Sequence, residues 1–139
     1  MDEIEINARE AACQALMRYE KRGTFPATTL EELYRSNAME RRERALSAEL
    51  TYGTLEQLLP IDYFLETVSS RPVAALDTPV RALLRLAAYQ ILYLDRIPDH
   101  AAVNEAVEMA ERMSPRAKGF VNGVLRNLAR QKELLFLPE

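Results

Sequence analysis

The chain has 139 residues, which is long enough for one domain whose core needs neither disulfides nor metals. Its net charge of −3 at pH 7 by itself argues mildly against nonspecific binding to a polyanion. Cys13 and His100 are the only cysteine and histidine, which excludes an internal disulfide and leaves a zinc site without its usual ligands. The sequence shows neither a signal-peptide pattern nor an apolar run of about 18 residues, so we expect a cytoplasmic protein without a membrane partner.

Two helices are predicted near the start of the chain. Asn7 followed by Glu10 is a capping box, and Gly23 is placed to end that helix in a left-handed conformation. Thr28 or Thr29, each followed by a glutamate three residues later, offers a second capping box. A short second helix is therefore predicted to follow the first.

The third and fourth predicted helices meet at Pro60. The third begins around Met39, and Gly53 within it is expected to cost about 1 kcal/mol relative to alanine. Pro60 cannot continue that helix but suits the first turn of the next. The inner face of the third is predicted to comprise Ala45, Leu46, Tyr52, Leu55, Leu58 and Leu59. That of the fourth is predicted to comprise Ile61, Phe64, Leu65 and Val68.

The segment Ser69–Pro72 interrupts the helical pattern. It is the best candidate for a linker, and it divides the chain into helical halves of about 1–70 and 71–133. We expect both halves to belong to a single domain spanning residues 1–139.

The most apolar stretch lies between residues 80 and 94. Its apolar residues cover far more of the helical circumference than the stripe expected of a surface helix. Because Arg81 and Arg85 interrupt it and it is short, it predicts a core helix of a water-soluble fold that the other helices surround. The apolar residues are Val80, Leu83, Leu84, Leu86, Ala87, Ala88, Ile91, Leu92 and Leu94.

Two further helices are predicted after the central one. Pro98 with Asp99 opens a helix over about residues 100–113, and Ser114 with Pro115 opens the last helix, which ends near residue 131. Its inner face is predicted to comprise Ala117, Phe120, Val121, Val124, Leu125 and Leu128. No strand pattern occurs, so the fold class is all-α with about seven helices.

Three polar residues in these helices have a structural interpretation. His100, at a helix start, is expected to cap or pack. Asn104 and Asn122 are expected to form hydrogen bonds among packed helices, because a buried amide must find partners.

The charges are distributed unevenly along the chain. Residues 1–20 contain five acids and two bases, whereas the cations that follow Arg112 are not interrupted by an acid as far as Lys132. At 100° per residue, one side of the last helix combines Arg116, Gly123, Arg126, Asn127 and Arg130. This side is either a phosphate-binding face or a solvated face whose cations complement the helix dipole.

Sequence motifs in the second half occur in a specific order. RP-x-x-x-LD, LRLAAYQ, P-x-HAAVNEAVE and GFVNGVLRN lie within residues 71–130, which resemble the C-terminal half of the NusB family. NAREAACQALMRYEKRG and RRERALSAELTYGTLEQLLPIDYFL extend the resemblance over nearly the whole chain. The resemblance implies an all-helical NusB-like bundle of two packed halves, with RNA passing near the start of the last helix.

Two kinds of NusB-like protein are compatible with these motifs. Antitermination factors open with an arginine-rich segment that grips box A RNA and work with ribosomal protein S10, whereas this chain opens with MDEIEINARE. RERALSAELTYGTLE, IDYFL, RIPDHAAVNEAVE and LLFLP are instead similar to the N-terminal domain of RsmB/Sun-type 16S ribosomal RNA cytosine-5 methyltransferases. In those enzymes a catalytic domain that binds S-adenosylmethionine follows, so residues 134–139 are interpreted as the start of a linker to it.

The resemblance favours an RNA-binding domain that recognises structured ribosomal RNA and has no catalytic, cofactor or metal residues. The expected RNA-binding residues are Arg116, Lys118, Phe120, Arg126 and Arg130. Cys13 lies on the apolar face of the first helix, where a buried thiol is expected rather than a nucleophile. A free-standing antitermination factor and a helical protein-interaction domain without RNA binding remain the alternatives.

Overall fold

The computed structural model describes residues 6–137, which contain helices and no strand. The acids at positions 2, 3 and 5, and the last two residues of the predicted linker, lie outside the described residues. The helices are α1 Ala8–Arg22, α2 Pro26–Asn37, α3 Arg41–Glu56, α4 Leu58–Val68, α5 Thr78–Tyr93, α6 Asp99–Met113 and α7 Lys118–Gln131. Three 3₁₀ turns accompany them: η1 Val73–Ala75, η2 Pro115–Ala117 and η3 Lys132–Leu134. The all-α prediction is confirmed.

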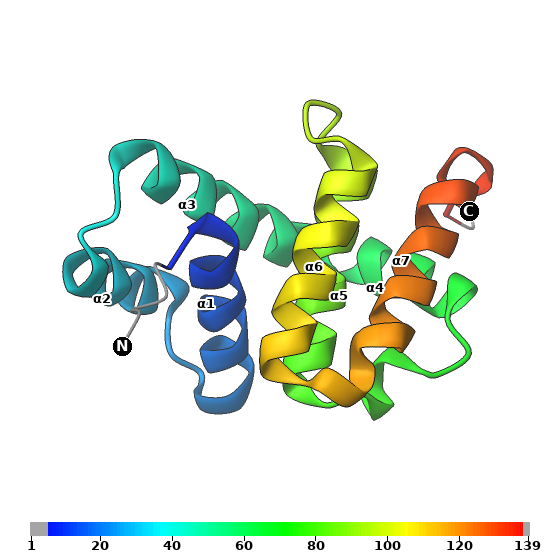
Figure 1. Cartoon of the computed structure of the whole chain (residues 1–139), viewed down its shortest axis with the longest axis horizontal. Helices are drawn as coiled ribbons and strands as arrows, with labels where there is room; N and C mark the ends of the chain where they lie inside the picture. The colour runs from blue at the N-terminus through cyan, green and yellow to red at the C-terminus, as the bar shows by residue number, and fades with distance from the viewer. Residues whose placement is uncertain (1–5, 138–139) are drawn as a thin grey trace.

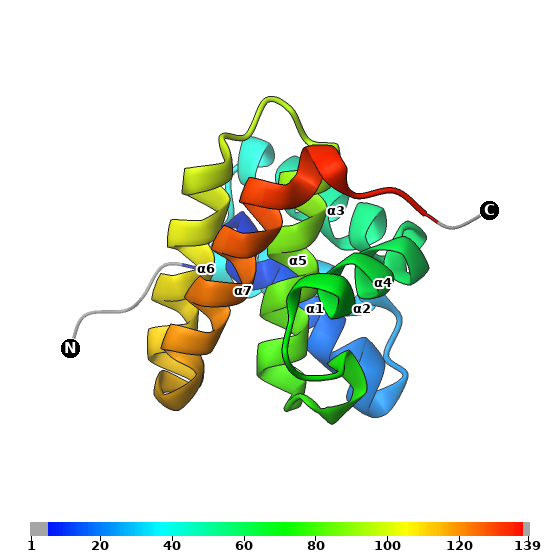
Figure 2. The same cartoon turned by 90° about the vertical axis from the view of Figure 1, so that its right-hand side faces the viewer.

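Helix α5 is the centre of the fold, as predicted. Ten of its 16 residues are buried, and the helix packs against α1, α3, α4, α6 and α7. Figures 1 and 2 show α1 to α3 gathered on one side of it and α6 and α7 on another. The other helices therefore surround a helix that is apolar around most of its circumference.

The predicted start and end of α1 are confirmed, with one difference. Asn7 Oδ1 accepts a hydrogen bond of 2.9 Å from the backbone N–H of Glu10, and Gly23 has a φ of 69°. The Glu10 carboxylate does not complete the capping box but pairs with Arg112 of α6 at 2.6 Å. The side chain of Glu10 therefore joins α1 to the second half of the chain.

The predicted capping box of α2 is wrong. The helix starts at Pro26 with Phe25 as its N-cap, and neither Thr28 nor Thr29 caps it. Proline suits the first helical turn because its φ is already fixed and it has no N–H to satisfy. Thr29 instead lies within α2 and is buried, and its hydroxyl has no hydrogen-bond partner among residues 6–137.

The predicted inner face of α3 is only partly right, since Leu46 and Leu55 pack against the core and other predicted residues do not. Ala45 and Tyr52 are exposed, Leu59 is 83% exposed, and the buried residues are Ser47, Leu50, Thr51 and Thr54. The three hydroxyls donate hydrogen bonds of 2.6–2.7 Å to carbonyl oxygens three or four residues earlier in the same helix. Because these bonds satisfy the hydroxyls, small polar residues can face the core.

Gly53 lies where α3 crosses close to Tyr89 of α5, so overpacking opposes the gain in helix propensity that alanine would bring. A Cβ atom at Gly53 would lie 2.1 Å from Cζ of Tyr89. Tyr89 is only 9% exposed, and its ring stacks on that of Tyr93 with ring centroids 5.6 Å apart. The ring therefore fills the space that a larger residue at position 53 would need.

Replacing Gly53 by alanine is expected to destabilise the fold by about 1–3 kcal/mol, because overpacking outweighs the better helix propensity of alanine. The double variant Gly53→Ala/Tyr89→Leu should lose less than the sum of the two single changes, since the leucine lacks the ring atoms that clash. Urea unfolding followed by circular dichroism measures all three. A Gly53→Ala protein more stable than the parent would contradict the close crossing.

Core changes in α5 are expected to be costly. Leu84 and Ile91 are 1% and 3% exposed, so each change to alanine should remove about 2–5 kcal/mol of unfolding free energy. Leu59→Ala is the matched control, because that side chain is exposed and its loss should change stability by less than about 0.5 kcal/mol. Losses below about 1 kcal/mol at both α5 positions would remove this helix from the core.

Candidate nucleic-acid interface

Helices α6 and α7 form an antiparallel pair joined by η2. Figures 1 and 2 both show them side by side. An ion pair of 3.3 Å joins Lys118 to Glu111 near the connection, and a second of 2.9 Å joins Lys132 to Asp99 at the opposite end. The end of α7 consequently lies beside the start of α6.

The orientation of α7 follows from its apolar face. Val121, Val124, Leu125 and Leu128 are buried, as predicted, while Ala117 and Phe120 are only partly buried. The opposite side is exposed and consists of Gly119, Gly123, Arg126 and Arg130. Burial of the apolar face of α7 therefore directs the side chains of Arg126 and Arg130 towards solvent.

The five predicted RNA-binding residues do not form one cluster. Arg116 lies in η2, just before α7, and Lys118 and Phe120 lie in the first turn of α7. Arg126 and Arg130 lie two to three turns further on, which is about 12–18 Å along the helix axis from Lys118 at 1.5 Å per residue. Phe120 also points about 120° away from Arg126 around the helix. The predicted site therefore divides into two ends.

Residues 112–132 contain no acid in the sequence, but acids from other parts of the chain lie beside them in the fold. Lys118 and Lys132 both pair with carboxylates of α6, and Arg112 pairs with Glu10 of α1. Arg116, Arg126 and Arg130 have no carboxylate within 4.0 Å in the described part of the chain. An external anion meets these three arginines without displacing an internal carboxylate.

Arg71 is a residue of this surface that the sequence did not reveal. Its exposed guanidinium carbon lies 5.7 Å from the centroid of the Phe120 ring, which is the geometry of a cation–π contact. The sequence marked this segment only as a linker. The fold brings it over α7 and adds a cation to the start of that helix.

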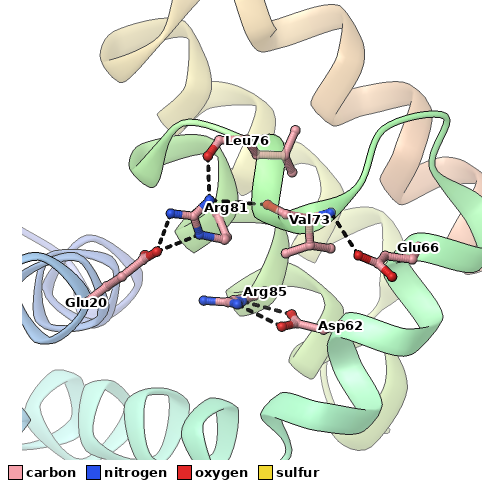
Figure 3. Close-up of polar contacts among 7 residues, drawn as sticks. All are labelled: Glu20, Asp62, Glu66, Val73, Leu76, Arg81 and Arg85. Atoms are coloured by element: carbon pink, nitrogen blue, oxygen red, sulfur yellow. Dashed lines mark hydrogen bonds and ion pairs between the residues drawn. The ribbon is translucent and has the colours of Figure 1, made fainter.

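Two arginines of α5 anchor the segment that carries Arg71. Arg85 binds both carboxylate oxygens of Asp62 in α4, at 2.9 and 2.7 Å. Arg81, one turn earlier, pairs with Glu20 at the end of α1. Figure 3 shows both guanidinium groups between the helices that they join.

Backbone groups of the α4–α5 connection complete this network. Arg81 donates to the carbonyl oxygens of Val73 and Leu76, and Glu66 accepts a bond of 3.1 Å from the backbone N–H of Val73 (Figure 3). The hollow beside the network has a volume of about 310 Å³. Three carboxylates and two guanidinium groups line it, and the guanidinium groups are already paired, so the hollow does not suit a phosphate.

Polar groups at the start of α1 form hydrogen bonds with α3 and α5. Arg9 Nε donates a bond of 2.8 Å to Oε1 of the buried Gln90, whose own amide donates to the carbonyl of Leu86 at 3.1 Å. The backbone N–H of Ala8 donates to Glu43 of α3 at 2.7 Å. Arg9 therefore joins α1 to α5.

The polar residues predicted to be structural behave differently from one another. His100 and Asn104 are exposed, and His100 does not cap α6, whose N-cap is Pro98. Both predictions are wrong because the two side chains are not enclosed in the core. Asn122 does form a hydrogen bond, accepting from Arg126 Nε at 3.1 Å. Asn127, predicted on the basic face, donates instead to the carbonyl of Val68 at 3.0 Å.

Cys13 is fully buried, as predicted. Burial, with a smaller contribution from the charge of Glu10, raises the pKa of the Cys13 thiol to about 12. A thiol in that state contains almost no thiolate at neutral pH, so it is a poor nucleophile. Residues 6–137 also contain no cluster of three potential metal-binding side chains and no helix long and apolar enough to cross a membrane.

Comparisons with known proteins give a family and related enzymes. The model of the NusB family matches residues 6–130. Probable ribosomal RNA small subunit methyltransferase B of Bacillus subtilis (strain 168) is 37% identical over 128 residues, which is 91% of this chain and 28% of that protein. Ribosomal RNA small subunit methyltransferase B of Klebsiella pneumoniae is 35% identical over 131 residues, which is 94% of this chain and 30% of that protein. The chain thus spans less than a third of these relatives.

Solved structures show the same fold. T. maritima NusB superposes with a TM-score of 0.80 at 26% identity, covering 97% of this chain and 100% of that one. A chain from the crystal structure of antitermination factors NusB and NusE in complex with dsRNA superposes with a TM-score of 0.80 at 22% identity, covering 88% of this chain and 93% of that one. These superpositions establish the arrangement of the helices.

Proposed function

The chain belongs to the NusB family, and from this premise we propose that it is the RNA-recognition domain of a small-subunit ribosomal RNA methyltransferase. The similarity to two such enzymes over nine-tenths of the chain supports this assignment. Because the similarity covers only a minor part of those enzymes, the catalytic steps belong to the remainder of a longer protein.

The observation that carries the proposal is the set of arginines on and beside α7 that have no carboxylate partner among the described residues. Arg126 and Arg130 are held outward by the buried face of the helix, and Arg116 and Arg71 lie at its start. Arginine in this arrangement binds phosphate oxygens, which supply most of the affinity of proteins for nucleic acid. These four arginines lie on or beside one helix of a chain whose net charge is −3.

A free-standing antitermination factor with a ribosomal-protein partner is the second candidate. The superposition over the full length of the T. maritima NusB chain favours it. The start of α1 favours the methyltransferase, because the single arginine there is bonded to Gln90 and is not presented to an RNA strand. A reading frame that continues well beyond the last residue would separate the two.

Binding of S-adenosylmethionine is assigned to a separate domain. Cytosine-5 methylation of the proposed kind needs an activated cysteine and a cofactor site. Cys13 is closed off in the core, and its raised pKa keeps the thiol protonated. The residues of this domain therefore position RNA and do not react with it.

The isolated chain is expected neither to bind S-adenosylmethionine nor to transfer its methyl group. Isothermal titration calorimetry with the cofactor should give no binding heat, and ribosomal RNA incubated with labelled cofactor should remain unmethylated. Cofactor binding, or methylation that survives Cys13→Ala, would contradict this division of labour.

RNA binding is expected to depend on salt and on α7. For a single strand, log K falls by about 0.7 per phosphate contact for each unit of log salt, so three or four contacts give a slope of roughly −2 to −3. Arg126→Glu/Arg130→Glu should weaken binding to ribosomal RNA fragments and flatten the slope. Fluorescence anisotropy at several salt concentrations measures both.

The matched control is Arg41→Glu/Arg42→Glu, which changes the net charge equally on the exposed start of α3. Circular dichroism should show unchanged helicity for both double variants, since all four side chains are exposed. Equal loss of affinity in the two variants would mean that net charge, and not this surface, binds RNA. No loss in either would favour a protein-interaction domain.

A further inference from the structure

A groove of about 300 Å³ lies between the start of α6 and the end of α7. Its floor is apolar, since Val103 is 4% exposed and Ala129 is half-buried. Its rim is polar: His100 and Asn104 come from α6, and Arg126 and Arg130 come from α7. The volume is at the lower end of the roughly 300–1,000 Å³ typical of small-molecule sites.

The charge of this groove differs from that of the other large hollows of the described residues. The hollow beside Arg81 contains three carboxylates and two guanidinium groups, and so does one of about 500 Å³ beside Arg96. The α6–α7 groove contains two guanidinium groups and one carboxylate, that of Asp99. Lys132 neutralises Asp99 at 2.9 Å, so the groove has a net positive charge.

The first turn of α6 adds to this potential. A 15-residue helix begins at Asp99, and its amide dipoles place partial positive charge at that end. The Asp99 carboxylate opposes an incoming anion, but its pairing with Lys132 limits the repulsion. An anion near Arg126 and Arg130 is therefore attracted by the guanidinium groups and by the helix end.

The rim of the groove also carries two side chains that can both donate and accept hydrogen bonds, whereas a simple anion only accepts them. The imidazole of His100 and the amide of Asn104 both donate and accept, and within residues 6–137 neither side chain has a hydrogen-bond partner. An apolar floor, a cationic edge and two amphoteric polar groups correspond to the three parts of a nucleotide: the flat base face, the phosphate and the base edge.

We propose that this groove binds one unpaired nucleotide of the RNA. The phosphate lies at Arg126 and Arg130, the base lies over Val103 and Ala129, and its edge contacts His100 and Asn104. The inference rests on the proposed RNA-binding function and adds a second point of contact, about 12–18 Å along α7 from Lys118. A base within a duplex cannot enter, because its edge is paired and its faces are stacked.

The test separates contacts to the base from contacts to phosphate. His100→Ala/Asn104→Ala removes two neutral groups, so the affinity for a single-stranded ribosomal RNA oligonucleotide should fall about tenfold while the salt slope stays unchanged. Arg126→Gln/Arg130→Gln should instead flatten the slope by about 1.4, the contribution of two phosphates. Thr28→Ala/Ser36→Ala, at exposed positions of α2, is the neutral control and should have no effect.

The outcomes distinguish this inference from the function on which it rests. If His100→Ala/Asn104→Ala binds like the parent while Arg126→Glu/Arg130→Glu is weakened, RNA binding stands and the nucleotide site is wrong. If the parent binds no RNA, both proposals fail. The proposal of an unpaired nucleotide also fails if a fully paired duplex binds as tightly as the single strand and loses as much affinity when His100 and Asn104 are replaced.

A nuclear magnetic resonance titration provides a second readout. Uridine 5′-monophosphate should shift the side-chain amide signals of Asn104 and the backbone signals around His100, whereas inorganic phosphate should shift mainly the arginine signals of α7. Equal signal shifts with uridine 5′-monophosphate and inorganic phosphate would mean that the groove binds only the phosphate group, which would contradict binding of a base. An acidic peptide that reproduces the nucleotide's shifts would assign the groove to a protein ligand.

Discussion

The enclosure of α5 is the constraint on which the rest of the structure depends. A helix that is apolar around most of its circumference must be covered on every side, and α1, α3, α4, α6 and α7 all turn a face towards it. That requirement determines which side of each outer helix remains in water. For α7 it buries Val121, Val124 and Leu128 and leaves Arg126 and Arg130 exposed. The candidate RNA surface is thus a consequence of core packing.

Ion pairs determine which cations remain available on that surface. Carboxylates of α6 neutralise both lysines of the α7 region, and Glu10 neutralises Arg112 while also closing the start of α1 onto α6. The arginines of α5 are paired in the network that holds the α4–α5 connection, which in turn places Arg71 over Phe120 (Figure 3). An acidic protein can in this way keep arginines beside α7 free of carboxylate partners.

The sequence predicted those features that depend on local periodicity. The fold class, the central helix, the ends of α1 and the inner face of α7 followed from apolar spacing and capping residues. The inner face of α3 followed only in part, because a count of apolar residues cannot detect buried hydroxyls that are bonded to their own helix. The role of Gly53 depends on Tyr89, which is distant in sequence, and Arg71 reaches Phe120 only through the fold. The predicted site divided into two ends because residues that are close in sequence separate along and around a helix.

The central claim is that RNA lies along α7, from the Arg71–Phe120 contact to the groove at the start of α6. Ultraviolet cross-linking of the chain to a single-stranded ribosomal RNA fragment, followed by mass spectrometry of the linked peptides, tests it directly without altering any residue. Linked peptides should come from the start of α6, from α7 and from the connection between α4 and α5. Linked peptides confined to α2 and the first half of α3 would contradict the claim.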